Sequence, residues 1–440
     1  MNALKHSFRG GIHVNEHKNT EKCAVTRIPA PSRVYIPLSQ HIGAPCTPAV
    51  KVGDTVLRGQ LIGEPGAGLG CPVHSSVSGT VVEFRTRHNA MGNIVTDVVI
   101  DNDGKDTPAD NLRPSDTPPE EWTTEKIIAA VRDAGIAGMG GASFPTHAKI
   151  ASALGKVDTL LINCAECEPY ITANHRLLLE DPMTVLRGTR LLVRALGLSS
   201  GTLVVEDNKQ DAIDLLEITC AASFPELKVS VVKTKYPQGD ERQLIYAVTR
   251  RELPSGKLPA DIGCVVFNAE TAASVYRAVT GGMPLIQRIV TVDGDCVKEP
   301  KNLLVPIGTT FRDLIDACGG LVKTPKLLIS GGPMMGFTQW NPDEPVTKGT
   351  SAILAMSEEA NKPYLGEHEC IRCGRCVAAC PMHLMPNYIA AYTKQDDYDS
   401  AKDYGAMSCV ECGSCSYICP AEVPIVQYVR RAKAVLRQKK

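Results

Sequence analysis

The chain has 440 residues, of which 43% are hydrophobic and 22% charged, a composition that is ordinary for a globular protein. Lysine and arginine (47) nearly balance aspartate and glutamate (48), so no excess of positive charge indicates a nucleic-acid partner. No stretch approaches about 20 uninterrupted apolar residues, and Met1–Glu21 has no apolar core, so we predict neither a membrane-spanning helix nor a signal peptide. Seventeen cysteines in such a chain indicate metal ligands and buried thiols in a reducing, cytoplasmic compartment. The length favours three or four domains.

The first segment, residues 1–110, is predicted to be a β-rich domain. Its short β-branched runs are broken by glycine and proline, which is typical of an antiparallel β-domain. Val50–Val56 and Val77–Val82 resemble the barrel-sandwich hybrid fold of biotinyl and lipoyl carriers. A carrier needs a lysine on an exposed hairpin, and the chain has none between Lys51 and Lys105. We therefore expect a structural or docking role.

The pattern changes after a linker at 101–123 that is rich in Asp, Asn, Pro and Thr. Alternating helical and strand-like runs predict an α/β domain with a mostly parallel sheet at 124–283. Its strands are expected at Thr159–Asn163, Gly201–Glu206 and Val229–Lys235, and its helices at Glu125–Ala134, Leu178–Gly197 and Lys209–Ser223. Residues 284–345 predict a small α+β unit of β-grasp type, with strands Arg288–Val292 and Asn302–Pro306 and helix Thr310–Ala317. A cysteine-rich domain is expected at 360–425 and a basic tail at 426–440.

Two copies of one cysteine motif carry the strongest chemical signal. Each copy is C-x2-C-x2-C-x3-C-P, in which three closely spaced cysteines hold one cubane and the fourth ligates the other cluster. We therefore assign one [4Fe–4S] cluster to Cys370, Cys373, Cys376 and Cys419, and the second to Cys409, Cys412, Cys415 and Cys380. Zinc sites are the alternative, but they more often use two separated C-x2-C pairs. The helical character of 386–404, between the copies, predicts an α-helical ferredoxin domain.

A glycine-rich segment of the α/β domain is the candidate phosphate site. It contains Gly138, Gly140 and Gly141, and Lys149 follows it. Backbone N–H groups and one positive charge can therefore approach a phosphate. Glycine clusters also form tight turns, and this one follows a predicted helix rather than a strand, so it is not the dinucleotide fingerprint.

Polar groups follow two predicted strands of the same domain and one further strand-like run that ends at Phe267. They are Asn163, Glu166 and Glu168 in the first segment, Gly239, Asp240 and Glu241 in the second, and Asn268 and Thr271 in the third. Because α/β sheets bind ligands at the carboxyl ends of their strands, we expect these groups to converge there. Such a set suits the edge of an isoalloxazine ring and a ribityl chain.

Three further features have competing interpretations. Cys164 and Cys167 form a C-x2-C pair, but no second pair lies nearby, so a separate metal site is disfavoured. Ser330–Gly336 is a second glycine cluster without a following lysine, which favours a tight turn over a phosphate loop. The basic tail has apolar residues at helical spacing, so it is either a solvated helix end or a helix attracted to anionic lipid or an acidic partner.

Taken together, these segments resemble a known family. Gly135–Lys149, Asn163–Pro169, Gly239–Glu241 and Asn268–Thr271 look like motifs of the FMN- and NADH-binding subunit of respiratory complex I. The order of domains is similar to the C subunits of Rnf complexes, the membrane-bound, ion-translocating ferredoxin:NAD+ oxidoreductases. The implied fold is a multidomain α/β and α+β chain. It has a barrel-sandwich-hybrid-like domain, a complex I flavin-subunit-like α/β domain, an SLBB-like β-grasp unit and an α-helical two-cluster ferredoxin domain.

The resemblance also implies cofactor contacts. FMN would be held by Gly138, Gly140, Gly141 and Lys149, and its ring or ribityl chain would be reached by Asn163, Glu166, Asn268 and Thr271. Phe144 would stack on the nicotinamide or adenine of NADH. Glu168 and Glu241 would hydrogen-bond the riboses of NADH, beside Gly239 and Asp240.

The function implied by the resemblance is that of an oxidoreductase subunit. NADH would bind beside FMN and exchange a hydride with it, and two [4Fe–4S] clusters would carry single electrons, in either direction. No protein acid or base is expected at the hydride step. Membrane and ferredoxin-like subunits would be the partners, and the chain would lie peripherally on the cytoplasmic face of the membrane. The alternative is a flavin-free iron–sulfur relay whose α/β domain is only a scaffold.

Overall fold

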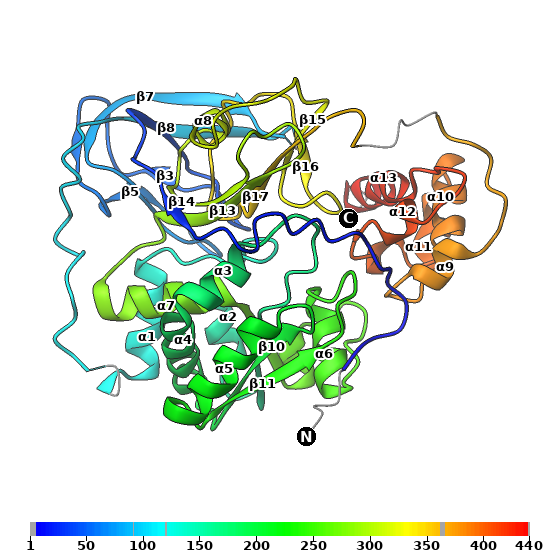
Figure 1. Ribbon diagram of the computed structural model, residues 1–440, viewed down its shortest axis with the longest axis horizontal. Helices are drawn as coiled ribbons and strands as arrows, with labels where there is room; N and C mark the ends of the chain where they lie inside the picture. Colours follow the sequence, from blue (N-terminus) through cyan, green and yellow to red (C-terminus); the bar gives the residue numbers. More distant parts are fainter. Residues whose placement is uncertain (1–5, 91, 119–120, 361–365, 439–440) are drawn as a thin grey trace.

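A computed structural model describes residues 6–90, 92–118, 121–360 and 366–438. Figure 1 shows an α/β unit at the bottom, two β-rich units above it and a helical unit at the right. The predicted succession of β-rich, α/β, β-grasp and helical units is confirmed. Among the described helices, none is both long and apolar enough to cross a membrane.

The N-terminal β-rich unit is built from two small antiparallel sheets. The first has the order β2-β8-β7-β4, with β2 at Arg33–Pro37, β8 at Ile94–Asn102, β7 at Gly79–His88 and β4 at Thr55–Val56. The second has the order β3-β5-β6, with β3 at Thr47–Pro48, β5 at Leu61–Glu64 and β6 at Val73–His74. Inward-facing Val34, Ile36, Val81 and Val98 are fully buried, as the alternation of the strands requires.

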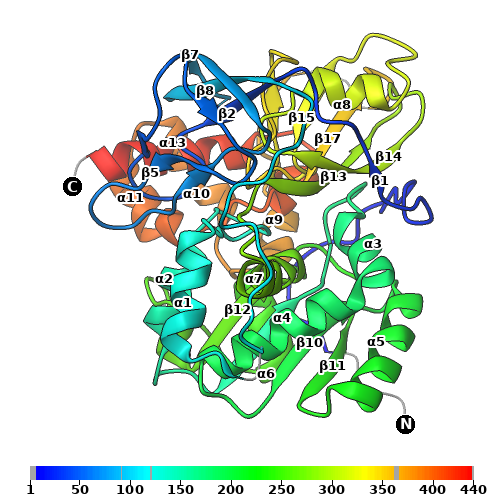
Figure 2. The ribbon, with the colours of Figure 1, turned by 90° about the vertical axis from the view of Figure 1, so that its left-hand side faces the viewer.

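The α/β unit contains a four-stranded parallel sheet in the order β11-β10-β9-β12. Figure 2 labels β10, β11 and β12 of this sheet and the helices around it. Its strands are β9 at Thr159–Asn163, β10 at Gly201–Glu206, β11 at Leu227–Val232 and β12 at Cys264–Asn268. Its helices are α1 (Thr124–Asp133), α2 (Thr146–Ala153), α3 (Ala173–Glu180), α4 (Pro182–Ala195), α5 (Gln210–Ser223), α6 (Glu241–Thr249) and α7 (Ala269–Gly281). One core contains α1, α4 and α7, and a second core lies between the sheet and α6.

The helix predicted at Leu178–Gly197 is wrong in one respect, because the structure divides it into α3 and α4. Pro182 has no N–H to donate to a preceding turn, and the Asp181 side chain accepts from the Thr184 N–H, so a new helix begins there. Within α4, Gly188 lets α7 approach closely, since a Cβ at this position would overlap the Ala272 carbonyl oxygen.

The third unit is a mixed sheet in the order β1-β14-β13-β17-β15-β16, covered by one helix. The strands are β1 (Thr26–Arg27), β13 (Gln287–Asp293), β14 (Lys301–Pro306), β15 (Leu327–Ser330), β16 (Phe337–Gln339) and β17 (Ala352–Met356). Helix α8 (Phe311–Ala317) begins with a capping box between Thr310 and Asp313. Because β13 pairs in parallel with β17, this sheet continues to Met356, beyond the predicted boundary at 345.

The C-terminal unit is helical, as predicted. It comprises α9 (Arg375–Ala379), α10 (Pro386–Lys394), α11 (Tyr398–Asp403), α12 (Ser414–Tyr417) and α13 (Ile425–Gln438). The expected basic tail is α13, whose apolar stripe packs in the core of this unit. Of its basic groups, Arg430 and Lys433 form ion pairs with Glu411 at 3.1 and 2.6 Å. Residues 425–438 are therefore an integral helix of the helical unit, while Lys439 and Lys440 of the predicted tail lie outside the described residues.

The N-terminal segment joins the units. We call residues 6–22 the N-terminal strap. It leads from the α/β unit to the helical unit and then returns between the α/β unit and the third unit (Figure 1). Ile12 forms an antiparallel bridge with Tyr236, and the Gly11 N–H donates to the Ala379 carbonyl at 2.9 Å. At Gly10 a Cβ would lie 2.5 Å from the Cys380 carbonyl oxygen, and φ is +75°, so glycine alone fits this crossing.

Candidate functional site

The glycine-rich loop lies against the N-terminus of α7. The Gly138 N–H donates to the Phe144 carbonyl at 2.9 Å, which closes the loop. The Met139 N–H donates to Thr271 Oγ1 at 3.1 Å, and a Cβ at Gly140 would stand 3.0 Å from the amide nitrogen of Asn268. Four of the predicted FMN contacts therefore meet in one place. Around Gly141 the space that a Cβ would need is open, which fits a phosphate approaching the backbone.

The ends of the neighbouring strands β9 and β12 place further predicted residues next to each other. Asn163 ends β9 directly opposite Asn268 at the end of β12, and its amide donates to the Gly239 carbonyl at 2.8 Å. Lys149 Nζ lies 2.6 Å from a carboxylate oxygen of Glu241, and both side chains remain partly exposed. The predicted convergence at this edge of the sheet is thus what the structure shows for these residues.

Two of the predicted residues, Asp240 and Phe144, make no contact with the glycine-rich loop through their side chains in the hydrogen bonds of the described residues. Asp240 is the N-cap of α6, where its carboxylate accepts from the N–H groups of Arg242 and Gln243. Phe144 is 37% exposed, so its ring is free to stack on a planar ligand.

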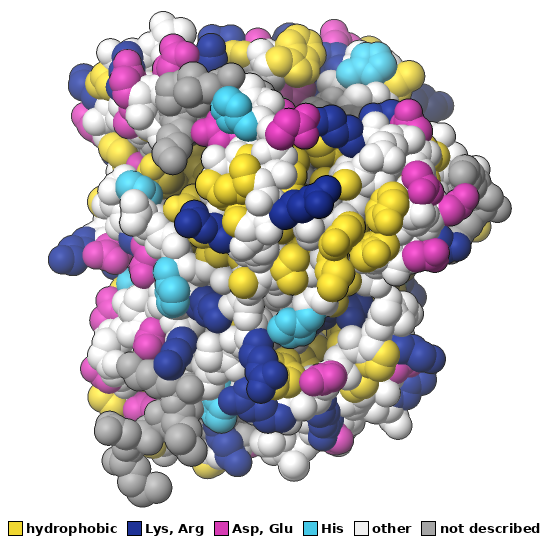
Figure 3. Space-filling model, turned by 90° about the vertical axis from the view of Figure 1, so that its right-hand side faces the viewer, with side chains coloured by type: hydrophobic (Ala, Val, Ile, Leu, Met, Phe, Trp, Pro, Cys, Tyr) yellow, Lys and Arg dark blue, Asp and Glu magenta, His cyan; other side chains and the backbone are white. Residues whose placement is uncertain are grey.

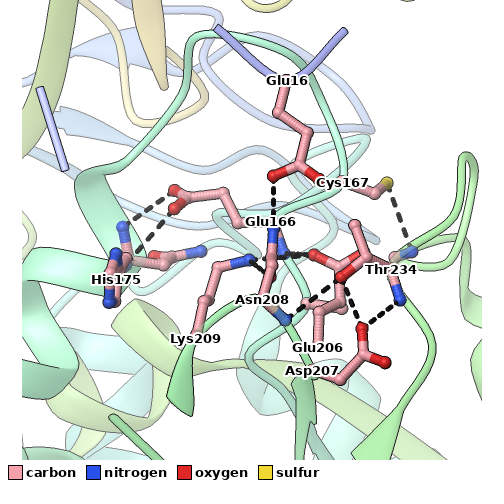
Figure 4. A network of polar contacts seen from close by, with 12 residues as sticks. Glu16, Glu166, Cys167, His175, Glu206, Asp207, Asn208, Lys209 and Thr234 are labelled. Carbon is pink, nitrogen blue, oxygen red and sulfur yellow. Dashed lines mark hydrogen bonds and ion pairs between the residues drawn. The ribbon is translucent and has the colours of Figure 1, made fainter. Parts of the chain in front are cut away.

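Glu166 does not face the glycine loop. Its carboxylate accepts from the N–H groups of Asn174 at 2.9 Å and His175 at 3.3 Å, in the first turn of α3. Figure 4 shows how its own N–H points to Glu206, whose Oε2 also accepts from Lys209 at 3.0 Å. Glu206 and Lys209 are both buried, so Glu166 belongs to a buried charge network behind the loop. The only signal in the sequence for this network is the position of Glu206 at a strand end.

Glu168 lies under the loop Ser330–Gly336 of the third unit. Its Oε2 accepts from the Met334 N–H at 3.1 Å, and its Oε1 is buried without a hydrogen-bond partner among the described residues. A Cβ at Gly332 would overlap Oε2, so this glycine is needed for close approach. The interpretation of Ser330–Gly336 as a tight turn is in line with this packing. Burial raises the pKa of Glu168 to about 7, although the N–H groups of Met334 and Met335 and the charge of Lys18 oppose the rise.

Replacing Glu168 with glutamine should make stability less dependent on pH. A buried carboxyl with a raised pKa stabilises the fold fully below its unfolded value of 4.5, and this contribution is lost as pH rises through about 7. Glutamine stays neutral, so the free energy of unfolding of Glu168→Gln relative to wild type should increase across this window. Urea unfolding at about pH 5 and about pH 8 measures the difference, with Glu64→Gln as an exposed control. An identical difference at both pH values would contradict the assignment.

The cysteines separate into two groups. Cys380, Cys409, Cys412 and Cys415 line one cavity, together with apolar Met382, Ile389 and Val410. In the other group, Cys376 is buried and its pKa is raised by burial and by its neighbours Cys419 and Cys370. Cys370 and Cys373 are exposed. The cavity brings Cys380 together with the three cysteines of the other motif, and Cys376 has Cys370 and Cys419 nearby. The crossed assignment of the two clusters, including the place of Cys373, stays a prediction.

The donor sets fit iron–sulfur clusters better than single metal ions. Across the part of the chain that the structure describes, no three His, Cys, Asp or Glu side chains converge on one ion-sized point. Four thiols instead surround a space, which suits a cubane because each cysteine ligates a different iron. Cys164 is fully buried and the Cys167 sulfur accepts from the Gly239 N–H at 3.3 Å, so that pair shows no metal geometry of its own.

Two contacts that the sequence did not predict tie the site to other units. The Tyr236 hydroxyl, 1% exposed, donates to the Cys412 carbonyl at 2.7 Å and so joins the α/β unit to the cysteine cavity. Lys348 is buried, and its ammonium donates to the carbonyls of Pro72 and Gly135, both at 2.7 Å. It thereby fixes the start of the glycine-rich loop from the third unit.

Fold and site together define a flavin-linked iron–sulfur electron-transfer protein. Family models match four consecutive parts of the chain: the RnfC barrel sandwich hybrid domain at 6–105, the Nuo51 FMN-binding domain at 131–277, the SLBB domain at 289–338 and a 4Fe-4S dicluster domain at 362–420. The chain thus carries an FMN-binding domain and a two-cluster iron–sulfur domain.

Two relatives identify the family. The chain is 46% identical over 435 residues to the C subunit of the Na(+)-translocating ferredoxin:NAD(+) oxidoreductase complex of Acetobacterium woodii, covering 98% of both chains. It is also 46% identical over 435 residues to the C subunit of the proton-translocating ferredoxin:NAD(+) oxidoreductase complex of Clostridium ljungdahlii, covering 97% of this chain and 93% of that one. The chain belongs to the family of Rnf complex C subunits, as the sequence motifs predicted.

A solved structure supports the fold. The NAD+-reducing [NiFe]-hydrogenase in the H2-reduced state matches 73% of this chain with a TM-score of 0.52 and 19% sequence identity. The chain spans 63% of that protein chain, and at this identity the likeness concerns the fold alone.

Proposed function

We propose that this chain is the NAD(H)- and FMN-binding electron-transfer subunit of an ion-translocating ferredoxin:NAD+ oxidoreductase. The observation that carries the proposal is the direct contact between the flavin motif and the cysteine cavity. Tyr236 precedes Gly239 in the flavin motif and is bonded to the backbone of Cys412. Bound FMN would exchange a hydride with NAD(H) and single electrons with the clusters.

The residues of the chain would hold and orient these groups. The glycine loop and Lys149 supply N–H groups and one positive charge for the FMN phosphate, and Glu241 is positioned beside Lys149 for a ribose. Phe144 offers an exposed ring for the nicotinamide or adenine. No side chain is required to move a proton in this arrangement, so the task of the protein is positioning.

The two cysteine groups would act in a fixed order. The cavity group lies next to the α/β unit, because Tyr236 contacts Cys412 and the Gln243 amide lies 3.5 Å from the Met382 sulfur. The other group reaches the surface at Cys370 and Cys373. We therefore assign the cavity group to the inner position and the Cys370 group to the outlet.

The surface around the outlet supports a partner there. Hydrophobic side chains gather on the face that carries the helical unit (Figure 3), and exposed Ile371, Tyr388 and Tyr417 belong to this unit. Membrane and ferredoxin-like subunits of the same complex would be the partners. The chain would lie peripherally on the cytoplasmic face of the membrane through them. The names of the two relatives specify different ions, so we assign no coupling ion.

The alternative is a flavin-free relay that uses only the clusters. Protein reconstituted anaerobically with iron, sulfide and FMN separates the two functions. Retained FMN after gel filtration and NADH-driven reduction of ferricyanide support the proposal. Well-folded protein that holds both clusters and retains no FMN would support the relay.

Replacing Lys149 with methionine should weaken FMN binding by about ten- to a hundredfold, the size of one lost charge-assisted hydrogen bond. The apolar stem is largely preserved, and both cluster EPR signals should stay intact because Lys149 lies in the α/β unit. Flavin fluorescence titration gives the dissociation constant. Lys156→Met, an exposed lysine seven positions on, is the matched control. Equal FMN dissociation constants of the two variants would show that Lys149 does not contact FMN.

A further inference from the structure

Lys18 of the N-terminal strap is bonded to a single loop of the α/β unit. Its ammonium donates to the carbonyl oxygens of Glu166 at 2.7 Å, Glu168 at 2.8 Å and Ile171 at 2.7 Å. An ammonium has three protons, and here each proton has its own acceptor. Three carbonyl groups of the loop that follows β9 therefore point to one ammonium, and this ammonium belongs to a segment outside the α/β unit.

The Lys18 ammonium lies among other buried charged groups. Burial lowers the pKa of Lys18, and the nearby ammonium of Lys209 lowers it further, whereas Glu166 and Glu206 oppose the fall. Two cations and two carboxylates thus share the space behind the loop; Figure 4 shows Glu166, Glu206 and Lys209 of this group. A buried charge is tolerated only when it is well paired, so removing one member is costly.

The residues on either side of Lys18 also contact this loop. The Tyr170 N–H donates to the Glu16 carbonyl at 2.8 Å, and the Tyr170 ring stacks on His17 with 4.8 Å between ring centroids. Thr20 Oγ1 lies 2.6 Å from Thr172 Oγ1. Lys18 is therefore held in place by contacts before and after it.

The loop fixed in this way starts at a predicted cofactor contact. It begins at Asn163, whose amide bonds to Gly239, and it contains Glu168, which lies under Met334. A shift of this backbone would move the residues that face the cofactor, and displacements of about 1 Å are enough to reduce binding and rate strongly.

We propose that Lys18 is a positioning residue that sets the shape of the flavin and nucleotide site from outside the flavin domain. This inference rests on the proposed function of that site. It assigns the N-terminal strap a role in cofactor binding, and not only in joining the units. Since coupling between two sites is reciprocal, FMN binding should also stabilise the strap.

The test compares two lysine variants of the full-length, cluster-loaded protein. Lys18→Met keeps an apolar stem and removes the three donors. Lys235→Met is the matched control, because Lys235 also anchors the strap, through the Phe8 carbonyl at 3.2 Å, without touching the loop. Lys18→Met should raise the FMN dissociation constant and the KM for NADH at least about tenfold with both cluster EPR signals retained. Lys235→Met should change neither constant more than about twofold. Unchanged constants in Lys18→Met, or an equal loss in Lys235→Met, would overturn the proposal.

A second measurement starts from the wild-type protein. Hydrogen exchange of the wild-type protein should slow in residues 6–22 when FMN is added, and exchange in 163–171 should slow with it. Protection of the loop without protection of the strap would overturn the role of Lys18. Protein that binds no FMN at all would instead overturn the proposed function. In that case faster exchange of 163–171 in Lys18→Met would still support the positioning role, and unchanged exchange would reject it.

Discussion

Replacing Cys380 with alanine removes the cluster whose other ligands are Cys409, Cys412 and Cys415, and leaves the cluster of its own motif in place. The structure supports this outcome because these four thiols line one cavity, whereas Cys370 and Cys376 lie with Cys419. Loss of one of four thiolates opens the cubane to solvent and labilises it. The iron content should fall by about half, and one of the two EPR signals should disappear.

The matched variant is Cys419→Ala, which should remove the opposite signal. Both variants should lose NADH-driven electron delivery to an outside acceptor that reacts at the Cys370 surface. Loss in Cys380→Ala of the signal that survives in Cys409→Ala would contradict the crossed assignment. So would retention of the full iron content.

Replacing Arg288 with methionine should lower the free energy of unfolding by about 3–5 kcal/mol. Arg288 is 2% exposed on β13, and its guanidinium lies 2.8 Å from Glu270 in the first turn of α7. It also donates to the Lys348 carbonyl. Removing it leaves the Glu270 carboxylate buried at the junction of the α/β and third units. Among the described residues, its remaining hydrogen-bond donor is the Ile289 N–H at 3.1 Å.

Urea unfolding measures this effect, and a double variant isolates its cause. Arg288→Met with Glu270→Gln should be more stable than Arg288→Met alone, since no unpaired charge then remains buried. A free energy of unfolding of Arg288→Met within about 1 kcal/mol of the wild-type value would show that the ion pair with Glu270 does not stabilise the fold. A double variant less stable than the single one would show that the loss comes from packing instead.

Much of the architecture could be predicted because its signals are local. The cysteine spacing predicts the two ligand groups, since one motif occupies few residues and its fourth cysteine has a fixed position before proline. Strand-like runs predict β9 and β10 within their observed bounds. The glycine loop and Asn163 meet as expected, because parallel strands end at one edge of the sheet.

What could not be predicted depends on contacts between distant segments. Lys18 lies 148 positions from Glu166 in the sequence. Nothing in the sequence around Lys18 indicates that its ammonium binds the carbonyl groups of a distant loop. Glu166 was expected at the flavin and caps α3 instead, because a carboxylate next to a free helix end is drawn to its N–H groups. Glu168 was expected at a ribose and lies beneath Met334, which belongs to another unit. Motifs indicate which chemistry is present, whereas the partners of each charge follow from the packing of the units.

The most direct test of the proposed electron path is an anaerobic titration of the wild-type protein, loaded with FMN and both clusters, with NADH. We expect NADH to bleach the flavin absorbance and to produce the EPR signal of the inner cluster, the one that is absent in Cys380→Ala. Dithionite serves as the control that reduces the clusters without the flavin. Cluster signals that appear with dithionite and never with NADH, in protein that retains FMN, would contradict the central claim that the α/β unit delivers electrons to the cysteine cavity.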